Sequence, residues 1–138
     1  MFQNTKAEVE VLLANERFYK AFSDGDFEAM SELWAHGVPV VCFHPTAPLL
    51  VGREAVLQSW RQLLRGVSSF ALRCEDAVIT VVNDTAILTC YEAAGDEPAH
   101  LAATNVFVLE EGQWKMVHHH AGPLSRPIRR QGPATVVH

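Results

Sequence analysis

The second half of the chain is a series of β-prone runs separated by short turns. Four runs can be distinguished: Phe70–Val82, Thr85–Ala94, His100–Leu109 and Gln113–His120. The segments between them are rich in Gly, Asn, Asp and Glu, which favour turns. Connections this short join antiparallel neighbours, because a parallel crossover needs a much longer segment. We therefore predict an antiparallel meander that makes up most of one sheet.

Three amphipathic segments predict helices before the meander. Residues 5–23 carry apolar side chains at helical spacing, with Thr5 as the capping residue and Gly25 suited to a left-handed end. Asp26 caps a second, shorter helix, and Gly52 precedes a third. Each helix therefore has an apolar side that needs a partner.

One more β-rich run, Val38–His44, lies between the second and third helices and is stopped by Pro45. The order is thus helix, helix, strand, helix and four strands. This order predicts an α+β fold in which three N-terminal helices cover one face of a curved antiparallel sheet.

Composition and charge exclude several classes of protein. The 138 residues, 49% of them hydrophobic, suit a single domain with a normal core. A net charge of -5 argues against binding to nucleic acids or anionic membranes. The sequence has neither a membrane-spanning apolar run nor a signal peptide, so we expect a cytoplasmic protein. The three cysteines, Cys42, Cys74 and Cys90, lie in apolar runs and are expected to be reduced thiols.

The C-terminal segment is rich in proline and arginine. Pro123, Pro127 and Pro133 argue against a continuous strand or helix there. We therefore predict a domain over residues 1–121 and a tail over residues 122–138. The tail is either loose or an arm that docks on a partner subunit.

Side chains along the last β-prone run alternate between two faces. One face carries two core-type residues followed by two imidazoles: Trp114, Met116, His118 and His120. The same alternation places His119 on the opposite face. We predict that His118 and His120 line a pocket, and that His119 is a bystander which faces away, towards a subunit interface in a dimer.

Five stretches match a known family in their order and spacing: Phe18–Asp26, Phe43–Pro45, Gly52–Val56, Thr104–Phe107 and Gly112–His120. Together they make residues 5–121 resemble the nuclear transport factor 2-like superfamily, especially its SnoaL-like branch. The resemblance implies a cone: a strongly curved sheet wrapped around three helices, as in the cystatin-like α+β barrel, with a pocket inside. It also implies a homodimer joined through the sheet.

The ketosteroid isomerases of this superfamily use a carboxylate base and an oxyanion hole made by a tyrosine and a protonated aspartic acid. The resemblance places His44 at the position of the base, Phe18 at that of the tyrosine and Asn105 at that of the aspartic acid, with Tyr19 one residue away from Phe18. Steroid isomerisation is therefore not supported. His44 is still able to act as a base, and Asn105 to donate a hydrogen bond to an oxyanion.

We therefore expect a pocket for a small apolar or partly polar organic molecule. The enzyme hypothesis is a cofactor-free lyase or isomerase acting on a small carbonyl compound, with His44 as base, Asn105 as oxyanion donor, and His118 or His120 as acid or orienting group. Glu92 and Asp76 are expected in solvent or at sheet edges. The remaining candidates are aromatic and belong to the core or the pocket wall: Phe18, Tyr19, Trp34, Trp60, Tyr91 and Phe107.

Alternatives remain for the site residues and for the function. His44 can cap its strand, and Asn105 can tie down a neighbouring loop. The whole domain can be a non-catalytic binding or dimerisation module. A third hypothesis is a metal-dependent hydrolase in which His44, His118 and His120 share a metal ion. No acidic residue is placed to orient these imidazoles, so we expect no metal.

Overall fold

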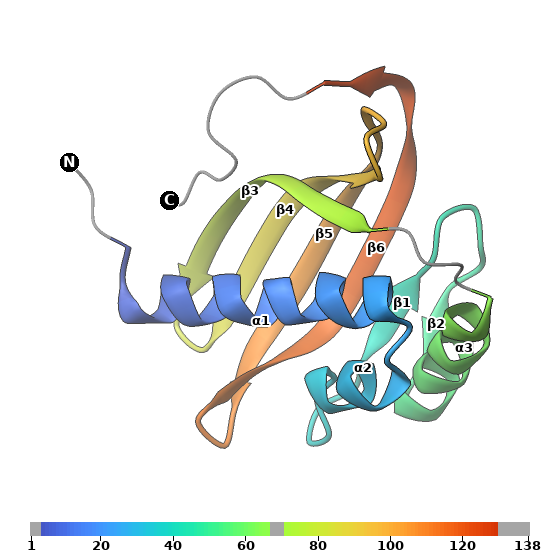
Figure 1. Ribbon diagram of the computed structural model, residues 1–138. Helices are drawn as coiled ribbons and strands as arrows, with labels where there is room; N and C mark the ends of the chain where they lie inside the picture. The colour runs from blue at the N-terminus through green and yellow to red at the C-terminus, as the bar shows by residue number, and fades with distance from the viewer. Residues whose placement is uncertain (1–3, 67–70, 130–138) are drawn as a thin grey trace.

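The structure is a computed structural model that describes residues 4–66 and 71–129. The described residues form three helices and one six-stranded sheet (Figure 1). The elements are α1 (Lys6–Asp24), α2 (Phe27–Leu33), β1 (Val41–Phe43), β2 (Leu50–Val51), α3 (Arg53–Arg65), β3 (Leu72–Val82), β4 (Thr85–Ala94), β5 (Ala99–Glu110) and β6 (Gln113–Ile128).

The sheet has the strand order β2-β1-β6-β5-β4-β3 and stays open at both edges. The meander from β3 to β6 is antiparallel, as predicted. The short strand β1 runs parallel to β6, so the sheet is not antiparallel throughout. The α+β class and the curved sheet on three helices are confirmed, whereas the sheet does not close into a barrel.

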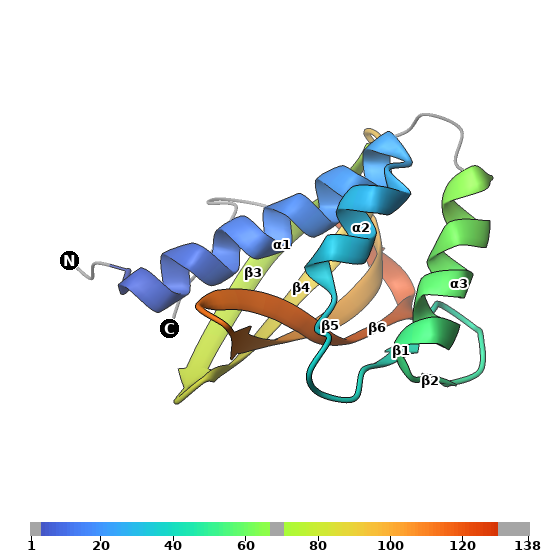
Figure 2. The same ribbon diagram turned by 90° about the horizontal axis from the view of Figure 1, so that it is seen from below.

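The helices all lie on the concave side of the sheet. In Figure 1 α1 crosses in front of the strands, and in Figure 2 α2 and α3 lie on the same side of the sheet as α1. The largest fully buried side chains come from both layers: Phe18 and Trp60 from the helices, Phe107 and Met116 from the strands. The core is therefore the space between the helices and the concave face, which we call the interior.

Local signals in the sequence place the helix ends as predicted. Thr5 and Glu8 form a reciprocal capping box at the start of α1, with N···O distances of 2.8 and 3.1 Å. Gly25 ends α1 in the left-handed conformation with φ of 65°. Asp26 Oδ1 then accepts the Ala29 N–H at 3.0 Å and caps α2.

Arg53, the first residue of α3, connects this helix to the end of α2. Its guanidinium donates to the carbonyl oxygens of Ser31 at 3.0 Å and of Trp34 at 2.7 Å. A third carbonyl oxygen, that of Ala35, lies 3.2 Å away. These carbonyls belong to the end of α2, where intrahelical partners are missing. One side chain of α3 therefore caps α2 and fixes the two helices together.

The prediction that the prolines end the last strand is wrong for residues 122–128. Strand β6 continues to Ile128, and Pro123 is paired with Leu101 of β5. The parallel strand β1 accompanies β6 only as far as His120. Beyond that point no strand of the described residues pairs with this edge of β6, and an unpaired edge tolerates a residue without an N–H. Residues 130–138 and Phe70 lie outside the described residues.

Strand β3 forms one edge of the sheet and carries an irregularity. The pairing of β3 with β4 shifts between Glu75 and Val78, and Asp76 there has φ of 55°. This is the geometry of a β-bulge, which bends the strand. Among the described residues no helix is long and apolar enough to cross a membrane. All three cysteines are unpaired, with Cys42 and Cys90 buried and Cys74 half-buried.

Candidate functional site

The faces predicted for the three histidines are wrong because β6 contains a bulge. The pairing of β6 with β5 is regular on both sides of Val117, which is an extra residue without a partner on β5. One extra residue exchanges the faces of all the residues that follow it. His119 therefore points into the interior and is only 3% exposed, whereas His118 and His120 lie on the outer face of the sheet.

Four side chains in the interior form a continuous series of hydrogen bonds, which we call the buried chain. His119 Nδ1 lies 2.6 Å from Asn105 Oδ1, and Asn105 Nδ2 lies 3.2 Å from Tyr19 Oη. Tyr19 Oη in turn donates to Glu92 Oε2 at 2.6 Å. A side branch runs from Asn105 Nδ2 to Asn15 Oδ1 at 2.8 Å. The chain thus connects α1 with three neighbouring strands, and all of its members are buried.

Burial sets the protonation of the buried chain. It lowers the pKa of His119 to about 3, with a further contribution from the neighbouring His44. Burial also raises the pKa of Tyr19, as does the adjacent Glu92 carboxylate, and it raises the pKa of Glu92 itself. At neutral pH the imidazole of His119 and the phenol of Tyr19 are therefore uncharged.

His44 follows β1 and is half-buried, close to α3. Its Nε2 lies 2.9 Å from Ser59 Oγ, and Ser59 Oγ donates its only hydrogen to the Val56 carbonyl oxygen at 2.6 Å. Ser59 must therefore accept a hydrogen from His44 Nε2, because a hydroxyl has one hydrogen to give. The proton of the neutral imidazole is then on Nε2, and the lone pair of Nδ1 has no hydrogen-bond donor within residues 4–66 and 71–129. Burial lowers the pKa of His44, which keeps this neutral form at neutral pH.

Trp60 of α3 packs near both inward histidines. Its ring meets His44 edge to face with a centroid distance of 4.6 Å, and it lies 5.9 Å from the ring of His119. Phe18 covers His119 from α1 at 4.9 Å. The Trp60 indole N–H is buried and has no hydrogen-bond partner among the described residues. We call His44, Trp60 and His119 the interior cluster.

The predicted site residues thus separate onto two sides of the sheet. The interior holds six of them: Phe18, Tyr19, His44, Trp60, Asn105 and Phe107. Trp34 is also fully buried, whereas Tyr91, His118 and His120 belong to the outer face. The expected convergence of His44, Asn105 and His120 is not found, because His120 stacks on Phe43 outside, with ring centroids 4.6 Å apart.

The residues that the sequence did not reveal are those that complete the hydrogen bonds. Glu92 was expected in solvent or at a sheet edge, but it is 3% exposed and bonded to Tyr19. The alternation of β4 could have indicated that Glu92 is buried. Leu88, Cys90 and Glu92 share one face of the strand, and the first two are residues typical of a core. Asn15 carried a signal of the same kind within the apolar stripe of α1.

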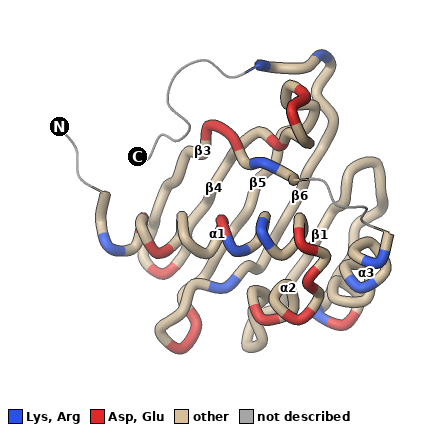
Figure 3. Tube along the Cα trace, viewed as in Figure 1, with Lys and Arg blue, Asp and Glu red and all other residues tan. Residues whose placement is uncertain are grey.

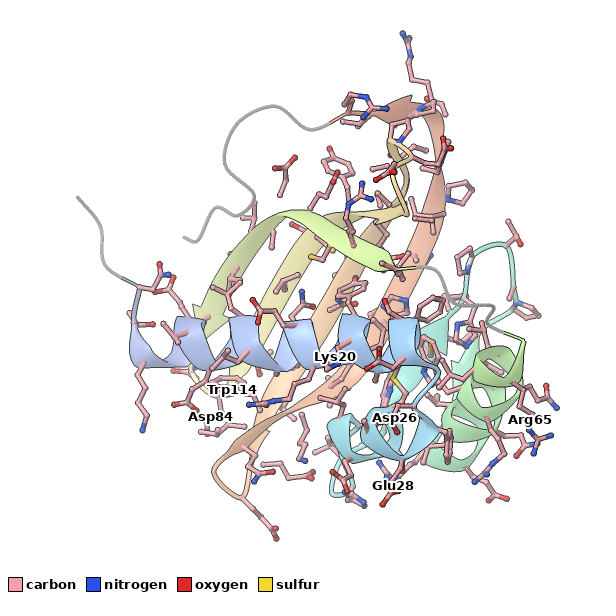
Figure 4. The ribbon with its side chains drawn as sticks, in the orientation of Figure 1. Lys20, Asp26, Glu28, Arg65, Asp84 and Trp114 are labelled. Carbon is pink, nitrogen blue, oxygen red and sulfur yellow. The ribbon has the colours of Figure 1, made fainter. Side chains whose placement is uncertain are left out.

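Two hollows of the described surface lie away from the interior cluster. A groove of about 560 Å³ runs between α1, α2 and the β5–β6 turn, near Lys20, Asp26 and Trp114 (Figure 4). A shallower hollow of about 530 Å³ lies on the outer face of the sheet, near Tyr91 and His120. The pocket predicted inside the cone therefore stays a prediction.

Charged residues gather on the helices, on the turns and on β3, whereas the central stretches of β5 and β6 carry none (Figure 3). Within residues 4–66 and 71–129, no group of three His, Cys, Asp or Glu side chains is arranged to hold a metal ion. The hydrolase hypothesis required His44, His118 and His120 to share a metal. Residue His44 faces the interior and the other two face outward, so the described geometry does not bring them together.

Residues 11–125 match the family of SnoaL-like domains. A solved structure from Streptomyces avermitilis is provisionally named a dehydratase of the NTF2-like family. It is 36% identical to this chain with a TM-score of 0.79, and the match covers 86% of this chain and 96% of that chain. Another from Thiobacillus denitrificans, provisionally named a calcium/calmodulin-dependent protein kinase type II association domain, is 37% identical with a TM-score of 0.73, and covers 81% and 93% of the two chains.

A third relative is the F-box protein SKIP8 of Arabidopsis thaliana, which is 28% identical over 111 residues. The match covers 80% of this chain and 48% of that protein, so the chain spans about half the length of this relative. A structure from Parabacteroides distasonis, provisionally named a ketosteroid isomerase, shares the fold at 16% identity with a TM-score of 0.68.

Proposed function

Because the chain belongs to the family of SnoaL-like domains, we propose that it is a cofactor-free lyase of the dehydratase type, which acts on a small, neutral hydroxycarbonyl compound. The observation that carries the proposal is the free lone pair on His44 Nδ1 beside a second neutral imidazole, that of His119. The similarity to the Streptomyces protein named as a dehydratase supports the same reaction class.

The chemistry requires a base for a proton next to a carbonyl group. His44 Nδ1 removes that proton, and the electrons of the broken C–H bond form an enolate. The enolate expels the β-hydroxyl group, which takes the proton back from the imidazolium and leaves as water. One imidazole thus serves as base and then as acid, and it returns to its starting form.

The remaining groups of the interior suit a neutral substrate. The Trp60 N–H is a donor without a partner, and a carbonyl or enolate oxygen can accept its hydrogen bond. The hydrogen bonds of the interior cluster and the buried chain involve no lysine or arginine. A carboxylate or phosphate substrate would therefore meet no compensating charge there.

The test is the reaction of simple β-hydroxyketones, such as 4-hydroxybutan-2-one, in deuterated water. Nuclear magnetic resonance would follow both deuterium exchange beside the carbonyl and the formation of the enone. We expect His44→Ala to lower both rates by about 100-fold or more. His36→Ala, which removes an exposed histidine, serves as the control. Equal rates for the wild-type protein and His44→Ala, or a wild-type rate no higher than that of free imidazole, would contradict the proposal.

A second candidate function is self-association without catalysis. It is favoured by the outer face of the sheet, where Ile87 is 43% exposed and the central stretches of β5 and β6 carry no charged residue. A face of this kind is complementary to a second copy of itself, because no like charges meet across a two-fold axis. The similarity to the Thiobacillus association domain points the same way.

Sedimentation of the wild-type protein and of Ile87→Glu tests self-association. A homodimer through the sheet predicts a dimer for the first and a monomer for the second at micromolar concentration. Val9→Glu, at a residue of α1 that is exposed to a similar degree, is the matched control and should leave the dimer intact. A wild-type protein that sediments as a monomer would reject this candidate.

A further inference from the structure

The hydrogen bonds of the buried chain can be donated in either of two directions, towards Glu92 or towards His119. The protonation of Glu92, at one end, decides which direction is adopted. We propose that Glu92 is a positioning residue which, through Tyr19 and Asn105, fixes the tautomer of His119, so that Nε2 faces a ligand as an unprotonated acceptor. The inference deepens the site of the proposed function and rests on it for the identity of the ligand, but its test does not require any reaction.

The first step is the bond between Glu92 and Tyr19. In the structure Tyr19 Oη donates to Glu92 Oε2 at 2.6 Å, so the carboxyl group is the acceptor of this bond. The single hydrogen of the phenol is therefore directed to Glu92. Tyr19 Oη can then only accept from its other neighbour in the chain, Asn105, at 3.2 Å.

The second step is the orientation of the Asn105 side chain. Its amino group must face Tyr19, and it also faces Asn15 Oδ1 at 2.8 Å. The carbonyl oxygen of the same amide then faces His119 Nδ1 at 2.6 Å and requires a hydrogen from it. A neutral imidazole has one such hydrogen, so Nε2 is left with a free lone pair.

A protonated Glu92 would permit the reverse direction. Its hydrogen could be donated to Tyr19 Oη, and the phenol hydrogen would be released towards Asn105. The Asn105 amide would then turn, and the Asn15 amide would have to turn with it, because two amide oxygens would otherwise face each other. The Asn105 amino group would donate to His119 Nδ1, and the imidazole proton would move to Nε2. Cys90 Sγ, at 3.4 Å from Tyr19 Oη, offers only a weak competing acceptor.

The groups around His119 do not replace Glu92 in this role. His44 is near enough to lower its pKa, Cys42 is its cross-strand neighbour on β1, and His118 and His120 flank it along β6. Asn105 is the partner of Nδ1 among the described residues. The flanking histidines act on the charge of His119, and burial together with these neighbours keeps its pKa low. The choice between its two nitrogens passes through Asn105.

The experiment measures the ring nitrogens of His119 directly, by nuclear magnetic resonance of full-length protein labelled with ¹⁵N-histidine. His119→Phe assigns the signals. At neutral pH we expect a protonated Nδ1 and an unprotonated Nε2 in the wild-type protein. Glu92→Gln keeps the shape but can both donate and accept, and Tyr19→Phe interrupts the chain. Both variants should move the two nitrogen shifts towards each other, because both tautomers become populated.

The matched control is Glu16→Gln, an acid-to-amide change on the exposed side of α1, which should leave the His119 shifts unchanged. Unchanged shifts in folded Glu92→Gln and Tyr19→Phe, or a wild-type Nε2 that carries the proton, would overturn the proposal. If neither variant folds, acidification of the wild-type protein gives the answer. As Glu92 gains its proton, the His119 proton should move from Nδ1 to Nε2, and the two ¹⁵N shifts should exchange accordingly. Shifts that stay unchanged through the protonation of Glu92 would overturn the proposal.

The outcome can be separated from that of the proposed function. His44→Ala removes the proposed base but leaves every member of the buried chain, so the His119 shifts should keep their wild-type tautomer. A protein without lyase activity whose His119 tautomer still depends on Glu92 would contradict the reaction alone. Lyase activity with a tautomer independent of Glu92 would contradict this inference alone.

Discussion

Asn105 Oδ1 lies 2.6 Å from His119 Nδ1, and the two residues are direct cross-strand neighbours on β5 and β6. The contact exists because the extra residue Val117 turns His119 to the concave side just before this pair. A polar pair at the centre of a core is costly unless its hydrogen bonds are complete. The buried chain supplies those bonds, and its members are therefore expected to affect stability together.

Replacing Asn105 by leucine should destabilise the protein by about 2–4 kcal/mol. The change keeps the approximate volume but leaves His119 Nδ1 and Asn15 Oδ1 without their partner. Urea unfolding followed by circular dichroism measures the loss. Thr104→Val, at the neighbouring position on the outer face, should stay within about 0.5 kcal/mol. Similar values for the two variants would show that the buried chain does not contribute to stability.

The free energy of unfolding should fall as the pH is lowered from about 6.5 towards 3. The folded protein holds the pKa of His119 at about 3, below the usual 6.5, so the unfolded chain binds the proton first. The slope that this one group contributes approaches about 1.4 kcal/mol per pH unit. His44 and His118, whose pKa values burial also lowers, act in the same direction.

Glu92 acts in the opposite direction, because burial raises the pKa of its carboxyl and the folded state then binds the proton more tightly. Its contribution is full at low pH and is lost as the pH rises through the folded pKa. His119→Phe isolates the imidazole: the variant should have a flatter dependence of unfolding free energy on pH between 6.5 and 4 than the wild type. Parallel curves for the two proteins would show that His119 is not held neutral by the fold.

Arg53→Ala should destabilise the protein by about 2–3 kcal/mol, since three carbonyl oxygens at the end of α2 lose their charged donor. Arg53→Lys should recover only part of this, because an ammonium group lacks the planar fork that reaches several carbonyls at once. Arg65→Ala, on the exposed part of α3, is the control. A thermal melt in which Arg53→Ala and Arg65→Ala coincide would refute the capping role.

The double substitution of His118 and His120 by alanine should leave the interior unaffected. Both side chains lie on the outer face, so the unfolding free energy of the monomer should change by no more than about 0.5 kcal/mol per residue. The exchange rate of a β-hydroxyketone should equal that of the wild-type protein. A large loss of that rate would contradict this expectation and would support the sequence-based prediction that His118 and His120 line the pocket.

The features that could be predicted from the sequence depend on neighbouring residues. Thr5, Gly25 and Asp26 mark helix ends because each satisfies or relieves the backbone within a few residues of itself. Asn83 marks the β3–β4 turn in the same way, with φ of 54°. These signals, in order along the chain, were sufficient for the α+β layout.

The site could be predicted only in part, because its geometry depends on the pairing of the strands and on contacts between residues far apart in the sequence. His44, Tyr19 and Asn105, which were chosen as pocket residues, lie in the interior, and their catalytic or binding roles stay predictions. The face of His119 depends on one unpaired residue, Val117, and β6 has no turn signal at that point. Glu92 is buried because Tyr19, on a helix far away in the sequence, donates a hydrogen bond to it. The sequence around a single carboxylate in a strand does not indicate such a partner.

The irregular edge of β3 has a consequence for solubility. An exposed strand edge offers free N–H and C=O groups to other chains and so promotes aggregation. The bulge at Asp76 bends this edge and places a carboxylate in it, while the opposite edge is β2, a strand of only two residues. Neither edge is a long, flat template. Although the sheet is open, its edges are thereby protected against pairing with other chains and growth into fibrils. Deletion of Asp76, which would remove both the bulge and its carboxylate, is the single change that should weaken this protection most.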